Sequence, residues 1–151
     1  MKLFKKIRTF LFLSFEMKLL LIEAYILLGY ARVLKSVSFS KVTPLLGENW
    51  NETSLEMDDS NKKILKNVSD AVDIMSRYTL WESMCLVKAI AAMKMLEKRK
   101  IESTIYFGTA KDDSGKLIAH AWLRSGPYYI TGADVMNRFV VVSKFAKKIH
   151  K

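Results

Sequence analysis

The apolar positions in the first two thirds of the chain repeat at helical intervals. Across residues 60–76 they recur at i, i+1, i+4, i+7, i+8 and i+11, namely at Ile64, Leu65, Val68, Ala71, Val72 and Met75. This spacing predicts an amphipathic helix, and Asp58, Asp59 or Ser60 can cap it. Residues 15–36 carry apolar stripes between an acidic and a basic face, which predicts a long helix packed on more than one side.

A further helix start precedes the only cysteine of the chain. Thr79 and Glu82 have the spacing of a capping box, with Ser83 as a competing cap, and the predicted helix runs to about Lys98. Alanine side chains are small, so the face that carries them can approach a neighbouring element closely. That face consists of Cys85, Ala89, Ala92 and Leu96.

Beyond residue 100 the apolar residues recur at every second position, which is the spacing of a β-strand. Strands are predicted over 101–109, 117–124 and 128–131, with a hairpin turn at 111–116. Residues 138–145 form a fourth strand or a helix, and their three consecutive valines favour the strand. The second strand alternates between two faces, one with Ile118, His120, Trp122 and Arg124 and the other with Leu117, Ala119, Ala121 and Leu123.

The order of these elements, helices first and then an antiparallel sheet, predicts an α+β fold. The length of 151 residues suits one domain. Within it we distinguish an N-terminal helical segment with an acidic loop, residues 1–59, from the core at 60–151 on which it packs. The Ser-, Thr- and Asn-containing stretch 37–59 predicts a loop with short helical pieces.

The formal net charge of +10 is concentrated at the two ends of the chain. Residues 1–10 contribute +4 and residues 138–151 contribute +5, which leaves +1 for the 127 residues between them. A nearly neutral body has no basic stripe that could follow a phosphate backbone, which argues against a nucleic-acid binder. The basic ends could instead attract an acidic peptide or a partner protein, or simply be solvated.

The N-terminus resembles a secretory signal only in part. A basic stretch precedes apolar residues, but charged residues follow at Glu16 and Lys18 without a small-residue cleavage site. No uncharged stretch reaches 18 residues, so a transmembrane helix is not expected.

One cysteine and two histidines exclude an internal disulfide and argue against a zinc site, so we expect a cytoplasmic protein without metal or cofactor.

Two residues of the core could act together in catalysis. Cys85 lies near the start of its predicted helix, where the helix dipole favours a thiolate. His120 follows 35 residues later in the middle of a strand and could accept the thiol proton if its sheet packs on the alanine face. Asp134, or more weakly Thr131, could orient the imidazole. Each also has an ordinary structural interpretation: a small buried cysteine, a structural histidine and a turn aspartate.

Several segments together resemble the leader peptidases of lasso-peptide biosynthesis, a family of the transglutaminase-like superfamily. The resemblance covers most of residues 60–145. It rests on Trp81-Glu-Ser-Met-Cys-Leu-Val-Lys-Ala89, Met95-Leu96, Ile105-Tyr-Phe-Gly108, Ala119-His-Ala-Trp-Leu123 and Ile130-Thr-Gly132.

This resemblance implies a transglutaminase- or papain-like cysteine protease core that cleaves the leader from a ribosomally made precursor peptide. By the family pattern Cys85 is the nucleophile and His120 the general base, while Asp134 lies a residue or two from the position of the third member. Trp81 and Trp122 would be walls of the substrate cleft. The short N-terminal segment implies a separate leader-binding protein, the RiPP recognition element, beside an asparagine-synthetase-like cyclase.

Two other classes remain open at this point. A transglutaminase-like acyl transferase would use the same cysteine and histidine. A non-enzymatic, membrane-associated adaptor would instead use the apolar helix at residues 19–34 on anionic lipid or a partner protein.

Overall fold

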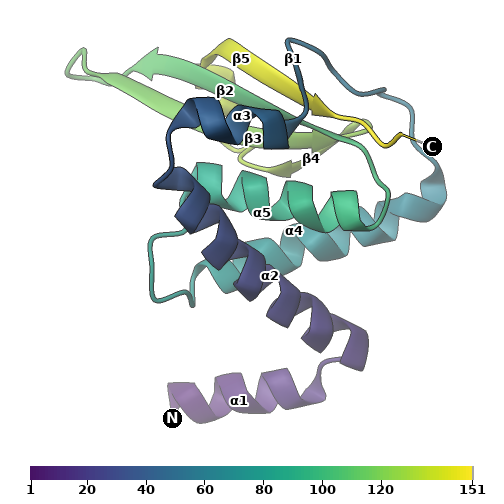
Figure 1. The fold of residues 1–151 in the computed structure, drawn as a ribbon. Coiled ribbons are helices and arrows are strands. Elements are labelled where there is room, and N and C mark those ends of the chain that lie inside the picture. The colour runs from purple at the N-terminus through teal and green to yellow at the C-terminus, as the bar shows by residue number, and fades with distance from the viewer. Residues whose placement is uncertain (151) are drawn as a thin grey trace.

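The computed structural model describes residues 1–150, which form five α-helices and one five-stranded sheet (Figure 1). The helices are α1 (Lys2–Phe12), α2 (Phe15–Lys35), α3 (Phe39–Leu46), α4 (Lys62–Ser76) and α5 (Cys85–Lys98). The strands are β1 (Glu48–Asn49), β2 (Ser103–Lys111), β3 (Leu117–Ser125), β4 (Tyr128–Thr131) and β5 (Val140–Lys147). Short 3-10 turns occupy Asp59–Asn61 and Met136–Arg138.

The predicted α+β order is confirmed. The helices predicted over 15–36 and 60–76 correspond to α2 and α4, and the uncertain segment at 138–145 is a strand, β5. All strand pairs are antiparallel, and the sheet has the order β1-β5-β2-β3-β4. The predicted loop at 37–59 contains α3 and the two residues of β1, which add an edge to the sheet.

The core lies between one face of the sheet and the helices. Helices α4 and α5 lie side by side under the sheet, and α2 crosses them (Figure 1). Ala89, Ala92 and Leu96 of the alanine face of α5 are fully buried there, together with Ile105 of β2 and Leu123 of β3. Residues 1–59 thus contribute α2 to the same core, and their division from residues 60–151 stays a prediction.

An ion pair joins α2 to the C-terminal end of α5. The Arg99 guanidinium donates two hydrogen bonds to the Glu23 carboxylate, at 2.8 and 2.6 Å, and a third to the Met95 carbonyl. The hydrogen bond from Arg99 lowers the pKa of Glu23 below its usual value. Such bidentate geometry fixes the angle between the two helices.

The first helix differs from the others because none of its residues is buried. It lies beyond α2 at the lower end of the molecule in Figure 1. Among residues 1–150, no helix combines the length with the apolar character that crossing a bilayer requires.

Candidate functional site

Cys85 is the first residue of α5, and its thiol is free and half-buried. Met84 caps the helix with an extended backbone and offers no side-chain hydrogen bond, and the first turn contains no acidic residue. The backbone N–H groups of a first helical turn have no partner within the helix. An anionic sulfur or oxygen at this position would therefore meet unpaired donors and the positive end of the helix dipole.

The capping box predicted at Thr79 is wrong. The Thr79 hydroxyl is hydrogen-bonded to the Ser83 hydroxyl at 2.8 Å and lies 2.9 Å from the Trp81 carbonyl oxygen and 3.3 Å from that of Ser76, to either of which it can donate its proton. These contacts hold residues 77–84 as a loop between α4 and α5, because the side chain that could have capped a helix is used within the loop. The helix therefore begins later than predicted, and Cys85 stands at its very start.

His120 lies on β3, where it pairs with Gly108 of β2. Its Nε2 atom is 2.8 Å from the carbonyl oxygen of Gly132. A carbonyl can only accept a hydrogen bond, so Nε2 carries the proton and Nδ1 of the neutral ring is left as the base. The ring also lies against Trp122 and Phe139, with centroids 5.7 and 5.0 Å away. The imidazole is thus held by one hydrogen bond and two aromatic neighbours.

The sheet packs on the alanine face of α5, but with the face of β3 that does not carry His120. Leu123 belongs to the core that contains α5. Because side chains alternate along a strand, His120 and Trp122 extend to the other face. The predicted packing of the sheet on the cysteine-bearing helix is thus confirmed, but this packing does not by itself bring His120 to Cys85. In the described part of the chain no hydrogen bond joins Cys85 to His120, although α5 and β3 are in contact.

Two glycines make room for the imidazole and its neighbours. Gly132 has φ +75°, and a Cβ there would lie 2.7 Å from the Ala121 carbonyl oxygen and 3.0 Å from His120 Nε2. A Cβ on Gly108 would lie 2.9 Å from the Trp122 ring and 2.8 Å from Phe139 Cβ. Sequence reasoning did not assign either residue to the site, although a glycine inside a strand pattern is a signal of close approach.

Asp134 lies in the exposed turn that follows β4. Over residues 1–150 it makes no hydrogen bond to His120, whose partner is the Gly132 carbonyl. The other candidate, Thr131, is buried at the end of β4, and its hydroxyl has no hydrogen-bond partner among the described residues. The role of Asp134 stays a prediction, and a backbone carbonyl occupies the orienting position next to the imidazole.

The two tryptophans have different surroundings. The Trp81 ring packs against Tyr25, with centroids 5.1 Å apart, and against Gly29 of α2. It thereby anchors the loop before Cys85 to α2. Trp122 is only 4 % exposed and stacks between Tyr106 and His120. Their predicted role as walls of a substrate cleft stays a prediction.

A buried polar network continues along the outer face of the sheet beyond Trp122. Arg124, only 3 % exposed, donates to the Tyr106 hydroxyl at 2.9 Å and to the carbonyls of Thr53 and Gly126. Tyr106 in turn donates to the Glu52 carboxylate at 2.6 Å. Burial, together with this hydrogen bond, raises the pKa of Tyr106 to about 12.

The network attaches the loop after β1 to the outer face of β2 and β3. This loop carries Thr53 and Glu52, while the crossover at residues 132–139 covers the His120 end of the same face. The sequence showed an acidic loop but could not show where it lies, because its partners are 50 or more residues away.

The family model of the transglutaminase-like superfamily matches residues 25–144. This match covers more than half of the chain, and the protein belongs to that superfamily. The superfamily includes cysteine proteases and acyl transferases, and its α+β, papain-like architecture agrees with the five-stranded sheet and its helices. No curated protein and no solved structure matches the chain.

Proposed function

We propose that the protein is a cysteine peptidase that removes the leader from a lasso-peptide precursor, with Cys85 as nucleophile and His120 as general base. The observation that carries the proposal is the half-exposed thiol at the first position of an uncapped helix, in a chain of the transglutaminase-like superfamily. Such a position favours a thiolate, which is the reactive form of cysteine.

In the proposed reaction the Cys85 thiolate attacks the carbonyl carbon of the last leader residue. The oxyanion of the tetrahedral intermediate can accept hydrogen bonds from backbone N–H groups of the first turn of α5. Imidazolium at His120 then protonates the leaving amine, which becomes the N-terminus of the core peptide. Water hydrolyses the thioester, releases the leader and restores the thiol.

The tautomer of His120 supports its part in this reaction. Its Nε2–H is engaged by the Gly132 carbonyl, so Nδ1 is the atom that would take the thiol proton. Cys85 and His120 are not hydrogen-bonded in the structure, and His120 extends from the face of β3 that does not meet α5. The proposal therefore requires a rearrangement that brings the two side chains together when a peptide binds. Catalytic hydrogen bonds often form only in the complex with substrate.

The choice of a lasso-peptide precursor rests on the resemblance of the segments around Cys85, Gly108, His120 and Gly132. That resemblance supports a separate leader-binding protein as partner. It also supports a cyclase that uses the new amine to close a macrolactam. The proposed products, a free leader and a core peptide with an α-amine, are chemically suited to that next step.

The experiment supplies a precursor peptide and its leader-binding protein to the wild type and to Cys85→Ala. Leader removal should disappear in the variant, while its thermal unfolding and its binding to the partner persist. Since Cys85 is the only cysteine, iodoacetamide provides a second test: one alkylated thiol should abolish cleavage by the wild type. Cleavage that survives either treatment contradicts the protease proposal.

Mass spectrometry of the products separates hydrolysis from acyl transfer. Hydrolysis yields the free leader carboxylate, whereas transfer yields an amide adduct of the leader with an added amine. An adduct that forms faster than free leader would assign the protein to the acyl transferases of the same superfamily.

A further inference from the structure

Helix α1 has one apolar and one basic face. At about 100° per residue, Leu3, Phe4, Ile7, Phe10 and Leu11 fall within a sector of roughly 120°. The remaining circumference carries Lys2, Lys5, Lys6, Arg8, Thr9 and Phe12. A short helix of this kind, with lysines opposite phenylalanine and leucine, is typical of segments that lie in a membrane interface.

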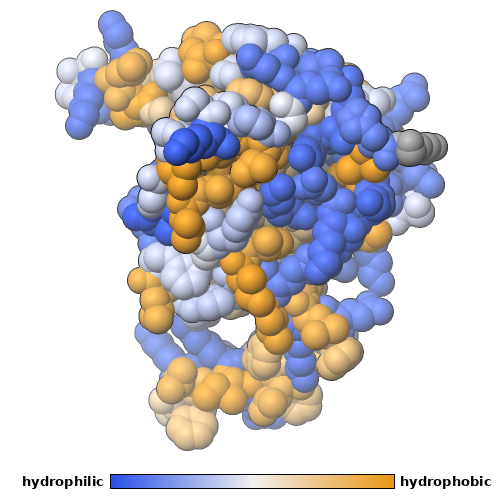
Figure 2. Space-filling model, in the orientation of Figure 1, coloured by the Kyte–Doolittle hydropathy of each residue, from blue (hydrophilic) through white to orange (hydrophobic). Residues whose placement is uncertain are grey.

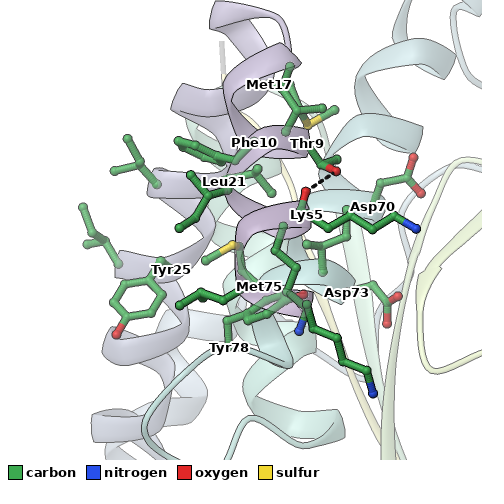
Figure 3. A pocket seen from close by; sticks show the side chains of 18 residues that line it. Lys5, Thr9, Phe10, Met17, Leu21, Tyr25, Asp70, Asp73, Met75 and Tyr78 are labelled. Atoms are coloured by element: carbon green, nitrogen blue, oxygen red, sulfur yellow. Dashed lines mark hydrogen bonds between the residues drawn. The ribbon is translucent and has the colours of Figure 1, made fainter.

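The apolar face of α1 is only partly covered by the rest of the protein, because Ile7 and Phe10 turn toward α2 and α4 while Phe4 and Leu11 do not. Phe4 is 79 % exposed and Leu11 64 % exposed. Between α1, α2 and α4 lies an open cavity of about 950 Å³, lined mostly by apolar side chains (Figure 3). In that view Phe10, Leu21, Tyr25 and Met75 line the space, with the Lys5 side chain at its edge.

The exposed apolar surface continues from α1 onto α2. Phe15, Leu19, Ile22 and Ile26 are each more than half exposed and lie along one side of α2. The opposite side of that helix is buried in the core through residues such as Leu28. Figure 2 shows the hydrophobic surface of α1 gathered at the lower end of the molecule. We call α1 together with this stripe of α2 the N-terminal apolar surface.

The charge of this surface indicates what covers it. Residues 1–15 contain four basic side chains and no acidic one. A second copy of the chain would bring a second set of four positive charges against the first, which opposes self-association. An anionic lipid bilayer, by contrast, offers negative headgroups to the lysines and acyl chains to the phenylalanines.

We propose that the N-terminal apolar surface binds peripherally to membranes that contain anionic phospholipids. Arg8 on the outside of α1 and the exposed lysines Lys2, Lys5 and Lys6 at the cavity contact the headgroups, and the exposed apolar residues of α1 and α2 enter the acyl boundary. The cavity between α1 and the body opens beside this surface, where acyl chains can fill it. Neither Cys85 nor His120 lines that cavity, so the inference is independent of the proposed peptidase activity.

Vesicle co-sedimentation of the full chain tests the proposal. Binding should be strong on phosphatidylcholine mixed with phosphatidylglycerol and weak on phosphatidylcholine alone. Each basic residue near an anionic surface strengthens binding roughly fivefold, so Lys5→Gln/Lys6→Gln/Arg8→Gln should weaken binding at least tenfold. Phe4→Ser/Leu11→Ser should also abolish most of the binding, because both side chains point away from the protein body.

The matched control replaces two leucines of similar exposure elsewhere, Leu55→Ser/Leu117→Ser, each 66 % exposed in the wild type. This control and Cys85→Ala should bind vesicles like the wild type. Equal binding to both kinds of vesicle, or binding that Phe4→Ser/Leu11→Ser leaves intact, overturns the proposal. So does sedimentation of a lipid-free dimer that the same double variant dissociates, which would assign the surface to a second copy.

Discussion

The two faces of β3 contribute differently to the protein, one through apolar burial and the other through directional contacts. On the inner face Ala121 and Leu123 are buried, and Leu123 belongs to the core that contains the helices. On the outer face His120 is held by a carbonyl and by aromatic rings, and Arg124 is held by a loop. Apolar burial on one side thus stabilises the fold, while directional contacts on the other orient polar groups. Substitutions on the two faces should therefore separate activity from stability.

The largest effect on activity is expected at His120. His120→Ala removes the proposed base and should lower kcat/KM for leader cleavage by roughly a thousandfold or more. Because the ring is only half-buried, the thermal midpoint should move little.

Asp134→Asn should change kcat/KM less than about tenfold if the Gly132 carbonyl alone orients the ring. A loss of orders of magnitude would instead assign Asp134 to the site.

The largest effect on stability is expected on the inner face. Leu123→Ala leaves a cavity beside α5 and should lower the free energy of unfolding by about 2–5 kcal/mol. The control is Leu117→Ala on the same face of the same strand, where the side chain is 66 % exposed and the change should stay within about 0.5 kcal/mol. Urea unfolding measures both, and equal effects would contradict the burial that separates the two leucines.

Gly132→Ala should affect both activity and stability. Its Cβ would collide with the Ala121 carbonyl and crowd His120 Nε2, so the hydrogen bond to the imidazole must lengthen. Gly115→Ala is the matched control, because Gly115 also has a positive φ, +83°, but open space around it. Both substitutions share backbone strain of about 1 kcal/mol, and overpacking should add about 1–3 kcal/mol at Gly132 alone. Cleavage assays and urea unfolding should show the larger loss only for Gly132→Ala.

The smallest effect on stability is expected at high pH, in the polar network of Arg124, Tyr106 and Glu52. Tyr106 has a pKa of about 12 in the folded protein, above the ordinary tyrosine value near 10. As pH rises, the unfolded chain therefore loses the Tyr106 proton before the folded protein does. The contribution of this hydroxyl to the free energy of unfolding is complete below about pH 10 and declines as pH rises toward 12. Tyr106→Phe should flatten the fall in unfolding free energy over that interval.

Tyr129→Phe serves as control for that measurement, because Tyr129 is 45 % exposed. It should leave the pH dependence of the wild type unchanged. Parallel curves for Tyr106→Phe and the wild type between pH 10 and 12 would show that the hydroxyl of Tyr106 is not held as the structure has it.

The sequence by itself determined the elements whose signals are local. The apolar repeats that define α2 and α4 and the alternation that defines β2 and β3 depend on residues close together in the chain, so their patterns predict them directly. Alternation also placed His120 with Trp122 and Arg124 on one face of β3, and the structure agrees. The cysteine was also correctly placed near the start of a helix, although the capping box from which this was predicted does not form.

Only the tertiary structure decided which face of β3 meets α5 and what orients the imidazole. Both faces of the strand carry large side chains, so the pattern cannot tell which one a helix will cover. The orienting group is the backbone carbonyl of Gly132, and a carbonyl is present at every residue, so no side-chain motif reveals it. The start of α5 depends on a local choice instead, because the Thr79 hydroxyl bonds within its own loop rather than to a helix. The covered face of β3 and the group that orients the imidazole depend on competition between contacts of distant segments, which is resolved only when those segments pack together.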